Sequence, residues 1–226
     1  MYKIRITMPV TNHSSIHPEC AESVKVLINS GIADFDFVPS FGSEIGMSRC
    51  AGIRALKQSD GSFIFDASED IEKELPDFDF VLSLDSDIAF TIDQFKILLE
   101  KSIELNTVVC GVFQTRWAEH AVYAGNFMEN AAPIIDHGHG VSVRDLTGNA
   151  EQVDWSSYGF SIIPRSVLIA VDAPWFCNYV VEYLFNEKKH FRYIHEDCGF
   201  SVALLRKNIP LYIHTGCYVK HLIGAV

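Results

Sequence analysis

Two carboxylates, those of Asp85 and Asp87, directly follow a short apolar run over Phe80–Leu84. A nearly continuous apolar segment of this length is typical of a strand that is buried on both faces of a parallel sheet. Open α/β sheets bind their ligands at the carboxyl ends of such strands. Because buried carboxylates are costly unless a cation pairs with them, the pattern predicts a site for a hard divalent ion shared with a phosphate. The alternative is a strand followed by an ordinary acidic turn.

A second pair of carboxylates, Glu196 and Asp197, opens a helix that we expect over Cys198–Lys207. Backbone N–H groups at a helix start favour anions, so helix capping is the alternative to a catalytic role for this pair. His221, near the end of the sequence, is a candidate metal ligand, and the alternative is an exposed or otherwise satisfied imidazole. As a ligand, its imidazole suits Mn²⁺ at least as well as Mg²⁺. His137 and His139 form an H-x-H pair in a glycine-rich loop, where a turn is favoured over a metal site.

The elements that must position these residues alternate between strand and helix, which predicts an α/β fold with a mostly parallel sheet flanked by helices. A helix is expected from Pro18 to a cap at Gly31, and another begins at a capping box formed by Thr91 and Gln94. Pro39 places its strand near an edge of the sheet. Strands are expected at Lys3–Val10, Asp34–Phe41, Ser62–Asp66, Phe80–Leu84, Thr107–Phe113, Ser156–Ile163, Leu211–Ile213 and Tyr218–His221, and further helices at Ser43–Lys57 and Pro164–Ile169.

Between Gln114 and Asp154, short strand-like pieces alternate with turns rich in Gly, Asn and His, and no helical pattern is evident. This change predicts a partly antiparallel region over the ligand-binding edge of the sheet. There are no internal repeats, low-complexity stretches or obvious linkers. We therefore expect one domain over residues 1–226, with a nucleotide-binding half at 1–113 and an acceptor and catalytic half at 114–226.

Composition excludes several classes of protein. The formal net charge of −11 argues against a nucleic-acid-binding surface. The six cysteines show neither a CxxC pair nor the spacing of a zinc site. No secretory segment opens the sequence, and no apolar run is long enough to span a membrane. These observations predict a cytoplasmic protein without a membrane span.

Four motifs occur in a characteristic order. They are Asp85-Ser86-Asp87 after the buried strand, Ser48-Arg49-Cys50 in the preceding helix, Trp155 with Gly159-Phe160-Ser161-Ile162-Ile163-Pro164-Arg165, and Pro174-Trp175-Phe176 followed by Glu196-Asp197, Phe200 and His221. Together they resemble the GT-A class of nucleotide-sugar-dependent glycosyltransferases, which combine a Rossmann-like fold with a D-x-D motif, and in particular its small viral and bacterial members. One departure is Cys50, which stands where an Asn often follows the Arg in that family.

The resemblance implies metal-dependent transfer of a hexose from a nucleotide sugar, most commonly a UDP-sugar, to a hydroxyl acceptor on a glycan, a lipid-linked glycan or a protein. It implies Mn²⁺ or Mg²⁺ as the cofactor, with Asp85, Asp87 and His221 as the metal ligands. In inverting members the Asp equivalent to Asp197 is the general base, whereas in retaining members the acidic pair orients the donor or the acceptor. The sequence leaves this stereochemistry open.

The same resemblance implies the residues that contact the substrates. Those expected at the nucleotide and donor sugar are Thr11, Arg49, Asp85, Ser86, Asp87, Gly111, Gln114 and Trp155. Those expected at the acceptor are Trp175 and Glu196. The two tryptophans are expected to offer ring faces to a sugar, because aromatic faces pack against the C–H surface of a pyranose; the alternative is that they belong to the core.

Two other functions compete with this interpretation. A nucleotidyltransferase that makes sugar nucleotides uses a similar sheet and a metal, but it usually has a glycine-rich, basic loop after the first strand. Residues 8–18 contain no Gly, Lys or Arg. A non-catalytic carbohydrate-binding module on the same fold is the other alternative, and the joint presence of Asp85, Asp87, Glu196, Asp197 and His221 argues against it.

Overall fold

The computed structural model describes residues 1–11, 15–42, 44–64, 75–113, 121–126, 140–142, 147–171, 173–185 and 188–222. Three residues singled out in the sequence, Gln114, His137 and His139, lie outside these ranges. Ser43, where the second helix was expected to begin, lies outside them as well.

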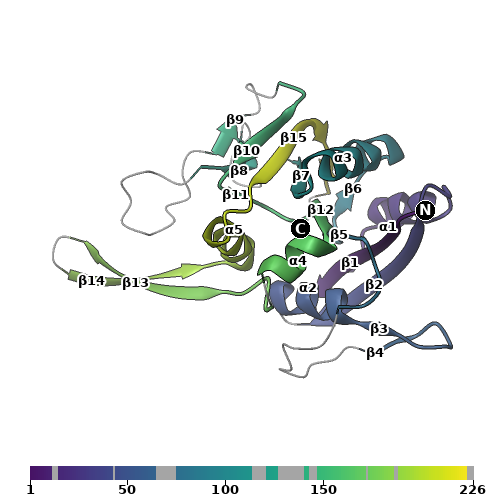
Figure 1. Cartoon of the computed structure of the whole chain (residues 1–226), viewed down its shortest axis with the longest axis horizontal. Helices are drawn as coiled ribbons and strands as arrows, with labels where there is room; N and C mark the ends of the chain where they lie inside the picture. Colours follow the sequence, from purple (N-terminus) through teal and green to yellow (C-terminus); the bar gives the residue numbers. More distant parts are fainter. Residues whose placement is uncertain are drawn as a thin grey trace.

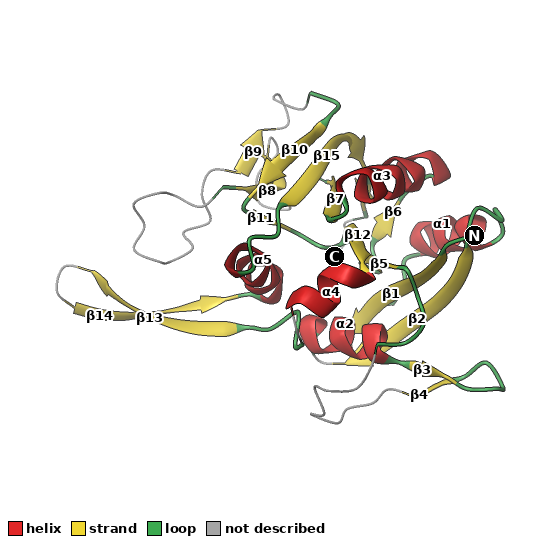
Figure 2. Cartoon of the chain, in the orientation of Figure 1, coloured by secondary structure: helices red, strands yellow, loops and turns green. Residues whose placement is uncertain are grey.

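A seven-stranded sheet forms the centre of the described chain (Figures 1 and 2). Its strands are β1 (Lys3–Thr11), β2 (Asp34–Gly42), β5 (Phe80–Leu84), β7 (Val108–Val112), β10 (Ala150–Val153), β12 (Phe160–Pro164) and β15 (Leu211–Tyr218). They lie in the order β10-β15-β7-β12-β5-β1-β2. Strands β10 and β12 run antiparallel to their neighbours, whereas β15 and β7, and β5, β1 and β2, pair in parallel. The predicted α/β class with a mostly parallel sheet is confirmed.

Helices cover both faces of this sheet. They are α1 (Pro18–Ile28), α2 (Ile45–Arg54), α3 (Ile92–Leu105), α4 (Arg165–Val171) and α5 (Glu196–Arg206). Leu27 of α1 and Phe95 of α3 pack with Ile6 in one hydrophobic core. Ile53 of α2, Leu168 of α4 and Phe200 of α5 belong to a second core on the other face. The two cores account for the continuous apolar run of β5, whose five residues are all buried.

Local signals fix several of the element ends. Thr91 and Gln94 form the expected capping box at the start of α3. The last turn of α2 is capped from β1, because the buried guanidinium of Arg5 donates hydrogen bonds to the carbonyls of Ile53 at 2.9 Å and Ala55 at 2.7 Å. These bonds satisfy carbonyls that a helix end leaves without a partner. The expectation of a helix through Lys57 is therefore wrong by one turn.

Small antiparallel units surround the main sheet. They are β3 (Leu56–Lys57) with β4 (Phe63–Ile64), β6 (Ile88–Ala89) with β16 (Lys220–His221), and β8 (Ala121–Gly125) between β9 (Gly140–Ser142) and β11 (Trp155–Ser156). In the last unit, β8 and β9 lie inside the segment from Gln114 to Asp154, where an antiparallel region was expected, and β11 directly follows that segment. The single strand expected at Ser156–Ile163 is instead divided between β11 and β12.

A two-stranded hairpin, β13 (Tyr179–Phe185) with β14 (Lys188–Ile194), was assigned no element from the sequence. It projects from the body beside α5 at the left of Figure 1. In the part of the chain that the structure describes, no helix has the length and apolar character needed to cross a membrane.

Candidate functional site

The acidic pair Asp85 and Asp87 lies at the carboxyl end of β5, where the buried strand gives way to a turn. The N–H of Asp85 donates to the carbonyl of Gly159 at 2.8 Å, which ties the turn to the adjacent strand β12. The N–H of Ile88 donates back to the carbonyl of Asp85 at 3.3 Å. Both carboxylates remain partly exposed, so they are available to a ligand at this edge.

Arg49 of α2 is the centre of the site. Arg49 is only 1% exposed, and its guanidinium donates to Asp85 Oδ1 from Nη2 at 2.6 Å. It donates to Asp197 Oδ1 from Nη1, and the same nitrogen lies 3.8 Å from Glu196 Oε1. The Phe176 ring lies below it, with its centroid 5.4 Å from the guanidinium carbon, an arrangement that also favours a cation.

This burial corrects the predicted role of Arg49. A guanidinium that is enclosed by carboxylates and an aromatic ring has almost no surface left for direct contact with a nucleotide. Arg49 instead holds Asp85, from the end of β5, together with Glu196 and Asp197, from the first turn of α5. It is therefore a positioning residue.

The electrostatics of the cluster follow from one cation among three carboxylates. Burial alone would lower the pKa of Arg49, but the charges of Asp197, Asp85 and Glu196 outweigh it and raise that pKa. Burial raises the pKa of the Asp197 carboxyl from 3.8 to about 6; Arg49 opposes this shift, and the charge of Glu196 adds to it. The site thus carries excess negative charge and a carboxyl that titrates just below neutral pH.

Two glycines allow α5 to pack closely against its neighbours, Gly46 at the contact with α2 and Gly199 at the contact with residues 177–179. A Cβ on Gly46, in the first turn of α2, would lie 2.9 Å from Glu196 Cβ and would collide with the carbonyl oxygen of Phe176. A Cβ on Gly199, in α5, would collide with the carbonyl oxygen of Cys177 and lie 3.0 Å from the Tyr179 ring. Without side chains at these positions, α5 packs closely enough for Asp197 to reach Arg49.

His221 returns from the end of the described chain to lie beside Asp87. Strand β16 pairs antiparallel with β6, and the N–H of Leu222 donates to the carbonyl of Asp87 at 2.7 Å. His221 Nε2 consequently lies 3.3 Å from Asp87 Oδ2, and its ring meets the edge of Phe113 at a centroid distance of 5.1 Å. A carboxylate oxygen beside an imidazole nitrogen is a donor set that Mn²⁺ accepts. Among the described residues, however, no group of three or more potential ligands is assembled.

The remaining donor-binding predictions have different outcomes. Thr11 ends β1 and is half-buried, at the same edge of the sheet as Asp85. Ser86 is nearly buried, and its carbonyl accepts a hydrogen bond from the N–H of His17 at 2.8 Å. Gly111 lies inside β7, where a Cβ would come within 2.7 Å of the Phe160 ring. This close packing gives Gly111 a structural role between strands, and the donor contact predicted for it stays a prediction.

Both tryptophans belong to the core. Trp175 is 3% exposed and its indole N–H donates to the carbonyl of Leu168 at 2.8 Å. Trp155 is 4% exposed and packs with Ile194 and Cys198. Neither ring has a face open to a sugar, so the platforms predicted for the donor and the acceptor are wrong. The alternative of core packing holds for both.

Two residues to which the sequence analysis gave no role support the carboxylates. A hydrogen bond from Ser157 lowers the pKa of Asp197 and so partly offsets its burial. Gly159 leaves room for Asp85, because a Cβ there would lie 2.5 Å from Asp85 Oδ2. A sequence signal existed for Gly159, which is part of the Gly-Phe motif, but a lone serine gives none.

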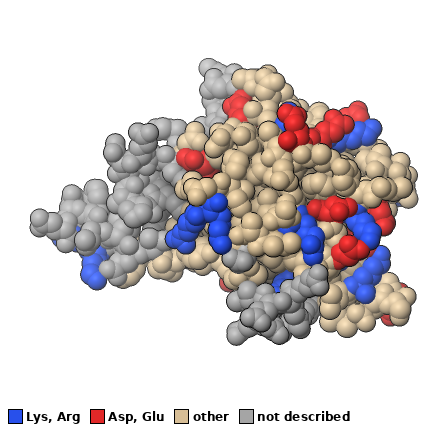
Figure 3. Space-filling model, in the orientation of Figure 1, with Lys and Arg blue, Asp and Glu red and all other residues tan. Residues whose placement is uncertain are grey.

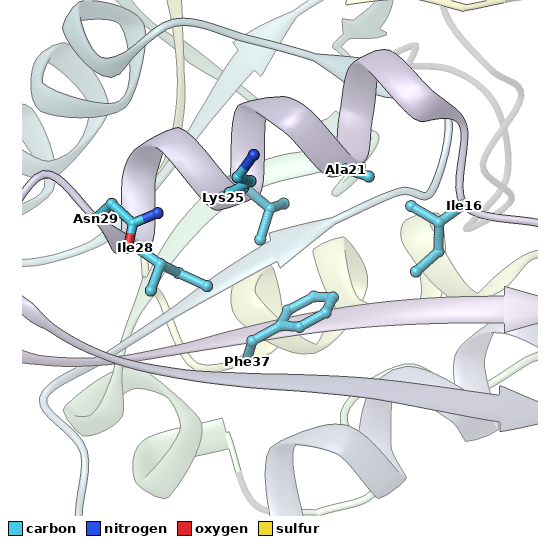
Figure 4. A pocket seen from close by; sticks show the side chains of 7 residues that line it. Ile16, Ala21, Lys25, Ile28, Asn29 and Phe37 are labelled. Atoms are coloured by element: carbon cyan, nitrogen blue, oxygen red, sulfur yellow. The ribbon is translucent and has the colours of Figure 1, made fainter.

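An apolar pocket lies apart from these carboxylates, between α1 and β2 (Figure 4). It is lined by Ile16, Ala21, Val24, Lys25, Ile28, Asn29 and Phe37. Its lining includes no carboxylate, and its one charged side chain, Lys25, lies 3.5 Å from Glu22. On the face seen in Figure 3, the described acidic and basic side chains are interspersed and form no single-sign patch.

The chain is similar in fold to a solved viral protein. The crystal structure of A197 from STIV superposes with a TM-score of 0.56 and 17% sequence identity, covering 99% of this chain and 87% of that one. No protein-family model matches the sequence, and no curated protein matches it significantly. The comparison shows that the α/β architecture described above, with its mixed and mostly parallel seven-stranded sheet, is shared over nearly the whole chain.

Proposed function

We propose that the protein is a metal-dependent glycosyltransferase that moves a hexose from a nucleotide sugar, a UDP-hexose, to a hydroxyl acceptor. One observation carries the proposal. Buried Arg49 joins Asp85 at the end of β5 to Glu196 and Asp197 at the start of α5. Asp87, in the same turn as Asp85, lies beside His221. Acidic groups concentrated at the carboxyl end of parallel strands suit a metal-bound diphosphate.

Asp87 and His221 would hold the metal ion, with diphosphate oxygens and water completing its coordination. Their donor atoms already lie 3.3 Å apart, and they fit Mn²⁺ in chemistry. When bound, the ion supplies positive charge that stabilises the departing nucleoside diphosphate. Asp85, held by Arg49, would add negative charge beside the metal ligand Asp87 in the same turn.

Asp197 has the properties of a general base for an inverting transfer. A base works best when its pKa lies near the working pH, and the pKa of Asp197 is raised to about 6 by burial. In the reaction it would accept the proton of the acceptor hydroxyl while that oxygen bonds to the anomeric carbon. The bond from the anomeric carbon to the diphosphate breaks in the same step. Glu196, beside it on α5, would orient the acceptor.

Two measurements test the proposal. Calorimetry with UDP, in the presence and absence of Mn²⁺, should show binding that requires the metal. Incubation with UDP-glucose or UDP-galactose and Mn²⁺ should release UDP slowly, because water can replace the acceptor. If neither binding nor hydrolysis occurs with uridine, adenosine, guanosine, cytidine or thymidine diphosphates and their sugars, the proposal is wrong.

A further inference from the structure

The hairpin formed by β13 and β14 presents an exposed apolar face. Val180 and Tyr193 are directly opposite each other in the antiparallel register, and Phe191 lies two residues from Tyr193, on the same face. The exposed fractions are 67% for Val180, 69% for Phe191 and 52% for Tyr193. The two aromatic rings are spaced by about 7 Å along the strand. A cluster of large apolar groups exposed on a projecting element is typical of a binding surface.

This face is continuous with the candidate active site. The Tyr193 ring meets the ring of His195 edge to face, with centroids 5.0 Å apart and an interplanar angle of 85°. His195 is the N-cap of α5 and is followed directly by Glu196 and Asp197. The pKa of Tyr193 is raised by desolvation and then by the charges of Glu44 and Glu196. The Tyr193 hydroxyl is thus close enough to Glu196 to interact with its charge. The exposed aromatic face therefore extends to the first turn of α5, which carries Asp197, the proposed general base.

The base of the hairpin is packed against α5, whereas Val180, Phe191 and Tyr193 on its other face are exposed. Ile194 is buried against Trp155 and Cys198, and the Tyr179 ring lies against Gly199 of α5. Phe191 and Tyr193 are half or more exposed. A ligand on this face would thus be held at a defined position relative to α5, and truncation of the two rings should leave the cores intact.

The chemistry of the face favours a carbohydrate. Flat aromatic rings present apolar faces to the C–H surface of a pyranose, while the hydroxyl of Tyr193 and the imidazole of His195 offer polar partners to its hydroxyls.

We propose that the exposed face of the β13–β14 hairpin, formed by Val180, Phe191 and Tyr193, is the acceptor subsite, and that it binds an oligosaccharide chain whose terminal hydroxyl is directed to Asp197. This inference rests on the proposed glycosyltransferase function and names the class of acceptor, a glycan, for that function. It also explains why the buried tryptophans are not needed as sugar platforms.

The test uses Phe191→Ala and Tyr193→Ala in the full chain, loaded with UDP and Mn²⁺. The probes are cellohexaose, maltohexaose, chitohexaose and mannohexaose, with binding measured by calorimetry. At least one hexasaccharide should bind the wild-type protein. Each variant should then lose about tenfold or more in glycan affinity, because one aromatic contact is removed, and this loss should exceed any change in UDP affinity. The matched control is Ile169→Ala on α4, also an exposed apolar residue at 54%, which should bind glycan and UDP as the wild-type protein does.

Three results would overturn the inference. In the first, the wild-type protein binds UDP and hydrolyses the donor but binds no hexasaccharide. In the second, the wild-type protein and both variants bind glycan with equal affinity. In the third, the protein binds no glycan but floats with phosphatidylglycerol vesicles in a way that depends on Phe191. A wild-type protein that neither binds a nucleotide nor hydrolyses a donor would instead overturn the proposed function itself. Circular dichroism of both variants excludes misfolding as the cause of a loss.

Discussion

The guanidinium of Arg49 joins the carboxylate of Asp85 to that of Asp197, which lies 148 positions after Arg49 in the chain. Arg49 and Asp197 are largely withdrawn from water and Asp85 is partly exposed, and the contact fixes α2, the end of β5 and the start of α5 relative to one another. Buried ion pairs add little net stability as pairs, but removing one partner leaves uncompensated charge. Arg49 should therefore matter to stability and to the geometry of the carboxylates at once.

Replacement of Arg49 by Met should lower the free energy of unfolding by about 3 kcal/mol, because Asp85, Glu196 and Asp197 lose their common cation. Urea denaturation measures the change. Arg49→Lys keeps the charge but not the two-pronged contact, so it should recover only part of the loss. The control is Lys25→Met, which removes an exposed pair with Glu22 and should change stability by less than about 0.5 kcal/mol. Equal stability of Arg49→Met and the wild-type protein would contradict the central role of Arg49.

The raised pKa of Asp197 should make stability depend on pH in a defined direction. Its pKa is about 6 in the folded protein against 3.8 ordinarily, so the folded state holds this proton more tightly than the unfolded state. The associated stability is fully present below pH 3.8 and is lost as the pH rises towards 6. Between pH 4 and 7, the wild-type protein should lose up to about 3 kcal/mol relative to Asp197→Asn. Denaturation of both proteins across this range measures the difference, and parallel curves would contradict the shift.

The same titration should appear in activity. If Asp197 is the general base, donor hydrolysis should increase as the pH rises through about 6, since only the deprotonated carboxylate accepts a proton. Asp197→Asn should reduce turnover by about 10²–10⁴-fold while largely sparing UDP binding. The measurement is the rate of UDP release as a function of pH, with calorimetry on the same samples. Near-normal turnover in Asp197→Asn would remove it as the base.

Local sequence signals predicted elements where one interaction dominates. The uninterrupted apolar run of β5 became a fully buried strand, Pro39 marked the edge strand β2, and the Thr91 capping box opened α3. Strand direction was not encoded in this way, since β12 has a buried pattern like that of β5 yet runs antiparallel to it. The hairpin of β13 and β14 has no sheet beneath it to impose a clear apolar repeat, and it was not predicted.

The candidate site shows the same division. The positions of Asp85, Asp87, Glu196 and Asp197 at element ends could be read from the sequence, because each follows or begins a strongly patterned segment. The burial of Arg49 could not, since it depends on the close approach of α2 and α5 at Gly46. For Trp155 and Trp175, residue type alone was misleading, because an indole packs as well in a hydrophobic core as against a sugar.

Removal of either predicted metal ligand should weaken metal-dependent nucleotide binding. Asp87→Asn and His221→Ala should each lower the affinity for UDP in the presence of Mn²⁺ by about tenfold or more, with little effect in its absence. Calorimetry with and without Mn²⁺ measures both affinities. The control is Asp93→Asn, an exposed carboxylate on α3 paired only loosely with Lys96 at 3.9 Å. Unchanged metal dependence in both variants would exclude this site.

Because the described residues assemble two ligands rather than three, Mn²⁺ should bind weakly without UDP.

Gly159→Ala should separate activity from stability at Asp85. The added methyl group would lie 2.5 Å from Asp85 Oδ2 and 3.0 Å from its Cγ, so the carboxylate must turn away and lose its 2.6 Å hydrogen bond with Arg49. The displaced atoms belong to a side chain rather than the backbone, and we expect a cost in unfolding free energy of only about 1–2 kcal/mol. Donor hydrolysis should nevertheless fall at least about tenfold, since small displacements of positioned groups are costly to catalysis. Denaturation and UDP-release assays on one preparation measure both effects. Full activity in Gly159→Ala would show that the position of Asp85 is not critical, and with it that the bridge through Arg49 serves folding rather than the reaction.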